Sequence, residues 1–318
     1  MFFASRLSLV TGGAGFIGSH LARALLEEGG RVRLALHERA PIVTDPRVEI
    51  VRGDLTRQED CLRAMQGVDL VFHAAGAVSG TGVTADNAMA GIAKNLNLTA
   101  EVLQAAWTAG VERILIFSSS TVYPASDHPI REEEAAEAAP HPSYLGYGRM
   151  RRYFEHLAEF VASRSSVKVA LVRPTAVYGP HDDFDPTTSH VIPALVRKAV
   201  ARLDPFEVWG TGDEVRDFLH VEDFARGCLL AMEKHAACDP INIGYGSAVT
   251  IRRVVEIILA AAGHGKAQVR FDASKPTAIP VRLVDTSKAR RLLGFEPRIP
   301  IETGLRDLVR WYVAQQVR

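Results

Sequence analysis

The chain is poor in cysteine and has no excess of charge of either sign. Only Cys61, Cys228 and Cys238 occur in 318 residues, and their spacing fits neither a metal site nor a disulfide framework. We expect small buried side chains in a protein of the reducing cytoplasm, with no bound metal. Lysine plus arginine and aspartate plus glutamate number 37 each. This balance argues against a nucleic acid or a charged membrane as partner, so local cations must meet any anionic ligand.

Long hydrophobic runs are also missing. No uncharged apolar segment reaches the roughly 18 residues that span a bilayer, so we expect no membrane partner. The first ten residues, M-F-F-A-S-R-L-S-L-V, have some features of a signal peptide, but they run directly into a glycine-rich turn and fit better as part of the fold. The length allows one large α/β domain or two coupled ones.

Short apolar segments alternate with helix-length amphipathic segments. We expect strands at 7–10, 31–36, 48–51, 69–73, 113–118 and 167–173, and helices at 16–28, 57–65, 92–109 and 145–164. Alternation with continuously apolar strands predicts an α/β fold, a doubly wound parallel sheet of the Rossmann type.

Turn-forming residues become frequent after Pro174. We therefore expect a dinucleotide-binding domain at 1–174 and a smaller, mainly substrate-binding lobe at 175–318, with 221–245 returning to the main sheet as helix 221–233 and strand 240–243. The run E-E-E-A-A-E-A-A at 132–139 predicts a solvated loop or helix.

A glycine-rich turn follows the first expected strand. In T-G-G-A-G-F-I-G, residues 11–18, Gly12, Gly15 and Gly18 have the spacing that lets a backbone approach a pyrophosphate. Phe16 and Ile17 open a helix whose N-terminus attracts that charge. The strand before the turn and the helix after it are the context that this motif requires. The segment therefore predicts a dinucleotide site.

The residues after the second expected strand bear on the form of the cofactor. A ribose-binding carboxylate is expected there, but Leu36 ends the strand and His37 and Arg39 follow. A cation suits a 2′-phosphate, so NADP(H) is favoured, while Glu38 keeps NAD(H) possible. A solvated Arg39 without a ligand is the alternative. Asp54, after the third strand, is placed to accept a hydrogen bond from an adenine amino group.

Small residues and hydroxyls follow two further strands. H-A-A-G at 73–76 lets backbone pass against a cofactor, although His73 can equally be a packing residue at a strand end. S-S-S-T-V-Y-P at 118–124 places hydroxyls at the carboxyl end of a parallel strand, where ligands bind. One of these hydroxyls can hold a substrate oxygen, and simple turn capping is the alternative.

A tyrosine and an arginine stand one helical turn apart in Y-G-R-M-R, residues 147–151. Positions i and i+4 share one face of a helix, so Arg151 should lie beside Tyr147. A neighbouring cation favours a phenolate, which suits a tyrosine that acts as acid or base. Arg152 is another candidate cation, but the helical spacing favours Arg151.

Together these segments resemble the extended short-chain dehydrogenase/reductases, the nucleotide-sugar epimerases, dehydratases and reductases, over essentially the whole chain. The resemblance implies Tyr147 as the acid/base, Ser119 as its hydroxyl partner, and Arg151 where the family has lysine. It also implies a set of residues that bind the cofactor: Gly12, Gly15, Phe16, Ile17, Gly18, His37, Arg39, Asp54, Leu55, Ala74, Ala75, Asn95, Tyr147, Arg151 and Pro174.

The second half resembles one branch of that family, GDP-L-fucose synthase, in the stretches 173–195, 208–225 and 271–285. The resemblance implies a GDP-sugar substrate whose nucleotide is bound by Lys198, Trp209, Arg216 and Arg282. The cations would serve the diphosphate and Trp209 the base or ribose. Core packing of Trp209 and a surface ion pair of Arg216 are the alternatives. The family also implies a homodimer through the helices near 92–109 and 145–164.

The sequence departs from that branch at two positions. The branch epimerises with a cysteine base and a histidine acid; His190 fills the histidine position, but Thr121 replaces the cysteine and is a far weaker base. Ketone reduction needs no such base, because hydride comes from nicotinamide while Tyr147 protonates the oxygen and Ser119 holds it. Arg151 keeps a positive charge but is longer than lysine, planar and unable to lose its proton.

Three hypotheses follow. The first is an NADP(H)-dependent oxidoreductase that reduces a 4-keto nucleoside-diphosphate sugar, with or without epimerisation through His190. The second is a redox-neutral, NAD-dependent nucleotide-sugar 4-epimerase that uses Tyr147 and Ser119. The third is a non-catalytic nucleotide-sugar-binding protein, suggested by Arg151 and Thr121.

Overall fold

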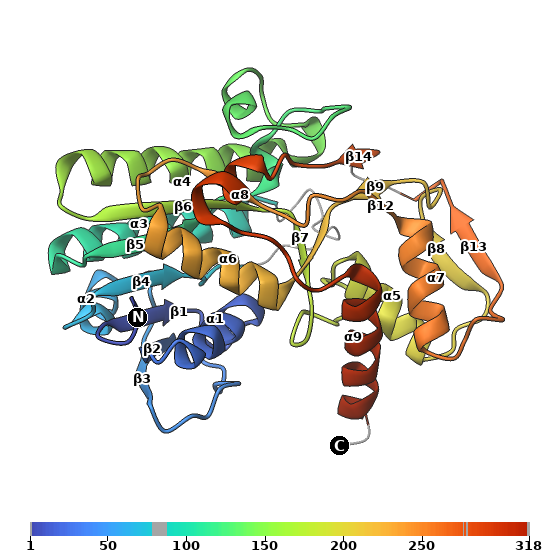
Figure 1. Ribbon diagram of the computed structural model, residues 1–318, viewed down its shortest axis with the longest axis horizontal. Coiled ribbons are helices and arrows are strands. Elements are labelled where there is room, and N and C mark those ends of the chain that lie inside the picture. The colour runs from blue at the N-terminus through green and yellow to red at the C-terminus, as the bar shows by residue number, and fades with distance from the viewer. Residues whose placement is uncertain (1, 78–87, 276, 278, 317–318) are drawn as a thin grey trace.

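The computed structural model describes residues 2–77, 88–275, 277 and 279–316. Within them, parallel strands form one central seven-stranded sheet in the order β11-β6-β5-β4-β1-β2-β3 (Figure 1). The bounds are Leu7–Thr11 (β1), Arg31–Leu36 (β2), Val48–Arg52 (β3), Leu70–His73 (β4), Arg113–Phe117 (β5), Lys168–Pro174 (β6) and Ile241–Ile243 (β11). The strand order reverses between β1 and β4, and the carboxyl ends of the strands at such a reversal are where sheets of this kind bind ligands. The predicted fold class is confirmed.

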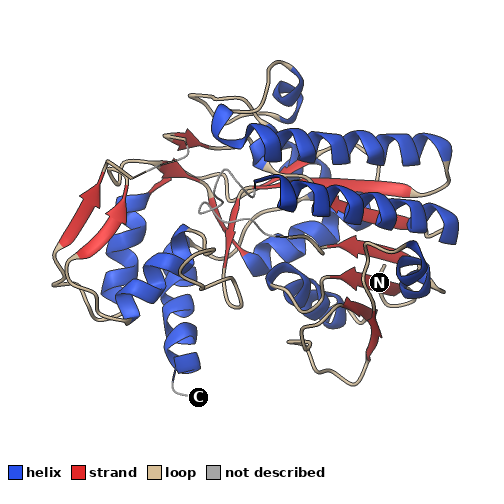
Figure 2. Ribbon diagram, turned by 180° about the vertical axis from the view of Figure 1, so that it is seen from behind, coloured by secondary structure: helices blue, strands red, loops and turns tan. Residues whose placement is uncertain are grey.

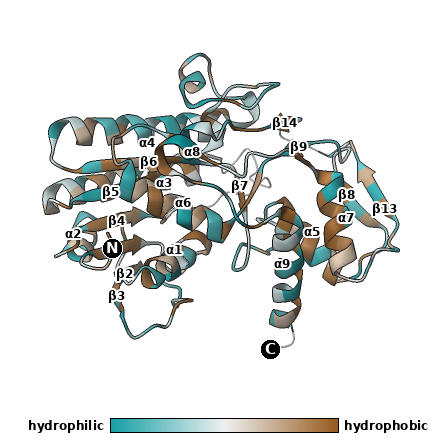
Figure 3. Ribbon diagram, in the orientation of Figure 1, coloured by the Kyte–Doolittle hydropathy of each residue, from teal (hydrophilic) through white to brown (hydrophobic). Residues whose placement is uncertain are grey.

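Helices cover both faces of this sheet (Figures 1 and 2). On one face lie α1 (Phe16–Glu27), α6 (Val221–Lys234) and α8 (Ser287–Leu293). On the other lie α2 (Gln58–Met65), α3 (Ala88–Ala109) and α4 (Leu145–Arg164). Because both faces are covered, the central strands β1, β4, β5 and β6 consist mainly of apolar residues, and Figure 3 shows them as mainly hydrophobic. None of the described helices is long and apolar enough to cross a membrane.

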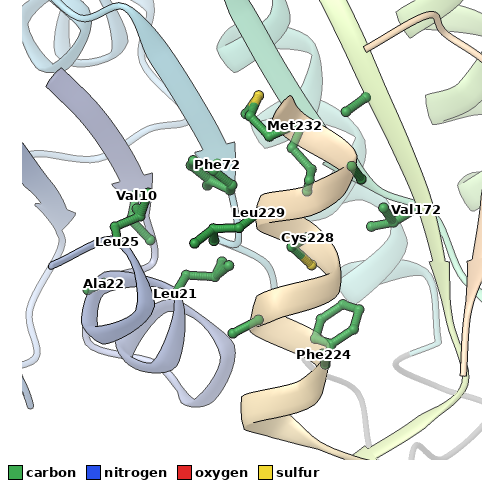
Figure 4. Close-up of a cluster of buried hydrophobic side chains, with 14 of the residues drawn as sticks. Val10, Leu21, Ala22, Leu25, Phe72, Val172, Phe224, Cys228, Leu229 and Met232 are labelled. Atoms are coloured by element: carbon green, nitrogen blue, oxygen red, sulfur yellow. The ribbon is translucent and has the colours of Figure 1, made fainter. Parts of the chain in front are cut away.

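The contact between α1 and α6 is the centre of one hydrophobic core. Leu21 and Leu25 of α1 belong to the same hydrophobic cluster as Phe224 and Cys228 of α6, and all four side chains are almost fully buried (Figure 4). Burial of a large apolar side chain stabilises a fold by about 1.5–3 kcal/mol. Segments about 200 residues apart in the chain are therefore held together as one layer.

The rest of the chain builds a smaller group of elements beside the sheet. A third core lies among α5 (Val191–Val200), α7 (Ile251–Ala261), α9 (Ile301–Gln316) and the parallel pair β8 (Phe206–Trp209) and β13 (Val269–Asp272). Short sheets join the two parts: β7 (Ala176–Tyr178) with β10 (Phe218–His220), and β9 (Val215–Arg216) between β12 (Val249–Thr250) and β14 (Val281–Arg282). The division of the chain at Pro174 stays a prediction, although strand β11 does lie in the main sheet.

Two expectations need correction. The run 132–139 is not simply solvated: it starts as a 3₁₀ turn, Glu132–Ala136, in which Glu132 and Glu134 are buried. Both carboxylates find backbone donors, since Asn242 N donates to Glu132 Oε1 at 2.8 Å and Arg131 N to Glu134 Oε1 at 2.8 Å. Helix α3 begins earlier than expected, at Ala88 rather than 92. The three cysteines are free; two are buried and Cys238 is partly exposed.

Candidate active site

The glycine-rich turn brings three backbone segments into contact at the end of β1. Gly12 has a φ of +65°, and a Cβ there would lie 2.8 Å from Ala75 Cα and 2.9 Å from Ala74 O. A Cβ on Gly18 would overlap Gly12 O, so helix α1 can start directly on the turn only with glycine at this position. Phe16 and Ile17 lie in the first turn of α1. This first turn contains no acidic residue. The cradle at the N-terminus of α1 therefore fits a dinucleotide pyrophosphate.

The expected adenosine end of the cofactor site is open. Arg39 is exposed and has no hydrogen-bond or ion-pair partner in the described chain, whereas His37 lies 3.9 Å from the Glu38 carboxylate. Asp54 Oδ1 accepts hydrogen bonds from Thr56 N and Oγ1, and these bonds lower the pKa of its carboxyl group. A cation and a fixed carboxylate thus remain available to a ligand. Leu55, next to Asp54, is buried in the core.

His73 and Asn95 hold the backbone that follows β4. His73 Nδ1 lies 2.9 Å from Thr11 Oγ1 and its Nε2 lies 3.3 Å from Thr99 Oγ1. Burial, with a smaller effect of Arg151, lowers the pKa of His73 to about 3, so it is a neutral packing residue. The Asn95 amide accepts from Ala77 N at 2.8 Å and donates to Ala77 O at 2.9 Å. Asn95 therefore supports the strand end that approaches Gly12.

Tyr147 and Arg151 lie together on α4, as the helical spacing predicts. Arg151 Nη2 donates to Tyr147 Oη, and its Nη1 donates to Phe117 O at 2.8 Å. The guanidinium also lies over the Tyr147 ring, with 4.8 Å between Cζ and the ring centre. Arg152 is engaged elsewhere, on the carbonyls of Val122 and Ala138. Arg151 is thus the cation beside the tyrosine, anchored at the end of strand β5.

The hydroxyl-rich turn packs directly against this helix. A Cβ on Gly148 would overlap Thr121 O, so α4 and the 3₁₀ turn Ser120–Val122 are in backbone contact. Ser119 precedes that turn, and its Oγ accepts from Thr121 N at 3.1 Å. Thr121 Oγ1 is buried and has no hydrogen-bond partner among the described residues. The turn and the tyrosine helix thus form one closely packed corner beside the end of strand β5.

His190 is the residue before α5 and is paired with a buried carboxylate. Its Nδ1 lies 3.8 Å from Asp182 Oδ1; the imidazole is 57% exposed, whereas the Asp182 side chain is only 4% exposed. The Asp182 carboxylate raises the pKa of His190, so the imidazolium persists to higher pH than usual. No contact joins His190 to Tyr147 in the described chain.

Arg216 and Arg282 face each other across β9 and β14, where they are partners in the parallel register. Burial, then mutual repulsion, lowers the pKa of Arg216, and burial lowers that of Arg282. Neither has a carboxylate partner in the described chain, and Arg282 Nη2 is buried without a hydrogen bond. The Arg282 Cζ lies 4.1 Å from the centre of the Tyr144 ring. Two uncompensated guanidiniums therefore create a place for an anion.

The other expected nucleotide contacts lie on neighbouring elements. Trp209, at the end of β8, is 50% exposed, so the alternative of a core tryptophan is wrong. Lys198 Nζ donates to Glu207 O at 2.9 Å, and burial lowers its pKa. Arg216 forms no ion pair among the described residues, which contradicts the surface-pair alternative. Of the stretch 271–285, residues 276 and 278 lie outside the described part.

Sequence reasoning missed Tyr144, Arg173 and Asp182. Arg173 is a charged residue that directly follows the apolar run V-A-L-V of strand β6, and this contrast was the available signal. Tyr144 stands three residues before Tyr147, so it belongs to the same helix start. In the described chain, no group of three or more histidine, cysteine, aspartate or glutamate residues is arranged to hold a metal ion.

The strand reversal, the glycine cradle and the tyrosine–arginine pair define a Rossmann-type dinucleotide enzyme. Comparison with known proteins narrows this class. Residues 8–244 match the NAD dependent epimerase/dehydratase family, and the chain therefore belongs to that family, a branch of the extended short-chain dehydrogenase/reductases. Its members are NAD(P)-dependent oxidoreductases and epimerases, so the chain is an enzyme of that kind.

Individual relatives are similar over nearly the whole length. The chain is 32% identical to a dTDP-4-dehydro-6-deoxy-D-allose reductase from Streptomyces sp, covering 98% of this chain and 97% of that protein. It is also 32% identical to the GDP-L-fucose synthase of Escherichia coli (strain K12), covering 97% of each. A solved UDP-glucose 4-epimerase from Thermotoga maritima, with UDP-glucose, has a TM-score of 0.86 at 26% identity, covering 98% of this chain and 99% of the other.

Proposed function

We propose that the protein reduces a nucleoside-diphosphate 4-keto-sugar with NADPH. The observation that carries the proposal is the Arg216–Arg282 pair, because two partly buried guanidiniums without a carboxylate partner match a diphosphate. The Arg282 guanidinium packs over the ring of Tyr144, at the start of the helix that carries Tyr147. A diphosphate held there would lie beside the element that holds the acid. The names of the two sequence relatives, a keto-sugar reductase and a GDP-sugar synthase, support this substrate class.

The chemistry follows from the corner formed by α4 and the hydroxyl turn. Bound NADPH supplies a hydride to the carbonyl carbon. Tyr147 donates its phenolic proton to the oxygen as negative charge develops there, and Ser119 donates a hydrogen bond to the same oxygen. Arg151 stabilises the remaining phenolate through its hydrogen bond to Tyr147. Asn95 holds the backbone of Ala77 after strand β4, on the side where the cofactor would bind.

Thr121 favours reduction without epimerisation. Its hydroxyl replaces a thiol base, is buried and is a poor proton acceptor at neutral pH. His190, with its pKa raised by Asp182, would remain as an acid without a matching base. The product would then keep the configuration of the carbons next to the ketone.

NADPH is proposed over NADH because of the open cation after β2. Arg39 is exposed and unpaired in the described chain, and His37 is near it in sequence. A 2′-phosphate would neutralise this cation. We propose a GDP-sugar as the first substrate to test and a dTDP-sugar as the second, following the two relatives. We also propose a homodimer and a cytoplasmic location; the free thiols fit a reducing compartment.

The test has a binding arm and a turnover arm. Calorimetric titration of cofactor-free protein should show tighter binding of NADPH than of NADH, and Arg39→Ala should remove the difference. With 4-keto-6-deoxy sugars of GDP and dTDP, NADPH should be oxidised stoichiometrically. Tyr147→Phe should abolish this turnover, whereas Tyr153→Phe, an exposed tyrosine on the same helix, should retain it.

A redox-neutral 4-epimerase is the second candidate, because the chain is structurally similar to a UDP-glucose 4-epimerase. Conversion of UDP-glucose with tightly bound NAD and no net oxidation of cofactor would replace the reductase proposal. Tight binding of a nucleotide sugar without conversion across the panel would identify a binding protein instead.

A further inference from the structure

A buried polar cluster lies directly behind the proposed catalytic corner, and its centre is Arg173 on strand β6. The Arg173 side chain is only 5% exposed, and the cluster contains Tyr123, Glu132, Glu155 and Asn242. None of these residues belongs to the expected cofactor or substrate contacts. The cluster therefore needs an explanation of its own, because charged groups are rarely placed in a core without a specific partner.

Arg173 binds helix α4 through a bidentate ion pair with Glu155. Its Nε donates to Glu155 Oε1 and its Nη2 to Glu155 Oε2, each at 2.7 Å. Glu155 follows Tyr147 by eight residues and Arg151 by four, so all three side chains lie along one face of the helix. A bidentate guanidinium–carboxylate pair fixes both distance and orientation. The pair therefore sets the position of the tyrosine face of α4 relative to the sheet.

The third nitrogen of the Arg173 guanidinium, Nη1, binds the end of the hydroxyl-rich turn and the segment that follows it. Nη1 donates to Tyr123 Oη at 3.0 Å and to Glu132 O at 2.7 Å. Tyr123 follows Ser119 by four residues, at the end of the turn. Its hydroxyl in turn donates to Asn242 Oδ1 at 2.5 Å. One guanidinium is thus bonded to both elements that carry the proposed catalytic residues.

Asn242 extends the cluster toward the smaller group of elements. It is the register partner of Arg173 between β11 and β6, and its Nδ2 donates to Ile130 O and Asp285 O, each at 3.1 Å. Asp285 follows β14, the strand of Arg282, by three residues. The described cluster is therefore continuous from the tyrosine helix to the segment that leads away from the arginine pair.

We propose that Arg173 is a positioning residue of the active site. Through its bonds to Glu155 and Tyr123 it fixes the position of Tyr147 relative to Ser119. The inference rests on the proposed function, since it assigns the residue to the geometry of that reaction. Catalytic groups displaced by a fraction of an ångström lose rate without losing binding. Loss of the cluster should consequently lower kcat and leave the binding of nucleotide sugar and cofactor nearly unchanged.

Two mild variants test the proposal. Glu155→Gln removes the charge of one partner, and Tyr123→Phe removes only the hydroxyl that joins Arg173 to Asn242. The matched control is Glu112→Gln, because Glu112 pairs with Arg6 through Oε2 at 2.8 Å at the opposite, amino-terminal edge of the same sheet. The expected result is a tenfold or greater fall in kcat for both test variants, with KM and the Kd for NADPH within twofold. The control should keep wild-type kcat.

A lower melting temperature with an unchanged kcat per folded molecule would show that the cluster is only structural, and would overturn the proposal. So would a rise in KM at constant kcat. If Glu155→Gln does not fold, the kcat and KM of Tyr123→Phe alone test the proposal.

A second readout needs no substrate. Amide hydrogen exchange should rise in residues 119–123 and 145–152 of both test variants, but not in the control. If wild type turns over no nucleotide sugar, the proposed function fails, and this exchange measurement still decides the inference. Exchange equal to that of the control would contradict it.

Discussion

Replacement of Arg151 tests how the proposed acid is supported. Arg151→Met removes a positive charge centred 4.8 Å from the Tyr147 ring and deletes the hydrogen bond to its hydroxyl. At an effective dielectric constant of about 20, that charge stabilises a phenolate at this distance by about 3 kcal/mol. Because the phenolate forms when Tyr147 gives up its proton, the loss belongs to the transition state. We expect kcat to fall roughly 100-fold.

Arg151→Lys separates charge from geometry. Lysine keeps the charge, but a single ammonium group cannot reproduce the fork that reaches both Tyr147 and Phe117 O. The partly buried carbonyl of Phe117 would lose a charged donor, at about 1–3 kcal/mol. This corresponds to a melting temperature lower by about 2–4 °C in a chain of this size. We expect kcat to fall by less than in the methionine variant.

The assay is NADPH oxidation under saturating keto-sugar, with thermal unfolding measured on the same preparations. Arg149→Lys and Arg149→Met are the controls, because Arg149 lies on the same helix, is exposed and has no partner in the described chain. A kcat for Arg151→Met within threefold of wild type would refute the electrostatic argument. A more than tenfold gain in turnover by Arg151→Lys, with the same product, would show that arginine is not suited to the native reaction.

Three further predictions concern other sites. Any step that uses His190 as an acid should lose activity as pH rises through the raised pKa of this group. In the pH–rate profile, Asp182→Asn should move this loss of activity to lower pH, because the carboxylate that raises the pKa is gone. A profile that does not move would exclude a role of the His190–Asp182 pair. Burial raises the pKa of Asp217 to about 6, so its contribution to stability is complete below about pH 4 and is lost as pH rises through 6. In urea unfolding, the unfolding free energy of wild type minus that of Asp217→Asn should fall by about 2 kcal/mol between pH 4 and 7, and a flat difference would contradict this. Phe160→Glu, on the exposed aromatic face of α4, should convert the proposed dimer to a monomer in sedimentation, unlike Glu159→Gln.

Local sequence patterns were sufficient to predict the strands of the sheet and the contacts within one helix. The strands were predictable because a parallel sheet covered on both faces leaves continuous apolar runs. Tyr147 and Arg151 were predictable because their distance depends only on helical geometry. The glycine cradle was predictable from spacing, although the approach of Ala75 to Gly12 required the sheet order.

Contacts between distant segments were not predictable. Arg173 meets Glu155, Tyr123 and Asn242 at separations of 18, 50 and 69 residues, and nothing in its own neighbourhood indicates these partners. The burial of Glu132 has the same cause, since its backbone donor comes from Asn242, 110 residues away. A run rich in glutamate favours a solvated segment until such a donor is known. Hydrogen bonds across the fold therefore overrode the local pattern.

The late position of β11 and α6 in the chain matters while the protein is being synthesised. The edge of β6 and the apolar face of α1, with Leu21 and Leu25, stay uncovered until Phe224, Cys228 and the strand Ile241–Ile243 have left the ribosome. A nascent chain that ends at Pro174 exposes an unpaired strand edge and a hydrophobic surface, both of which promote aggregation. The dinucleotide-binding half is therefore expected to depend on chaperones until the second half of the chain closes it.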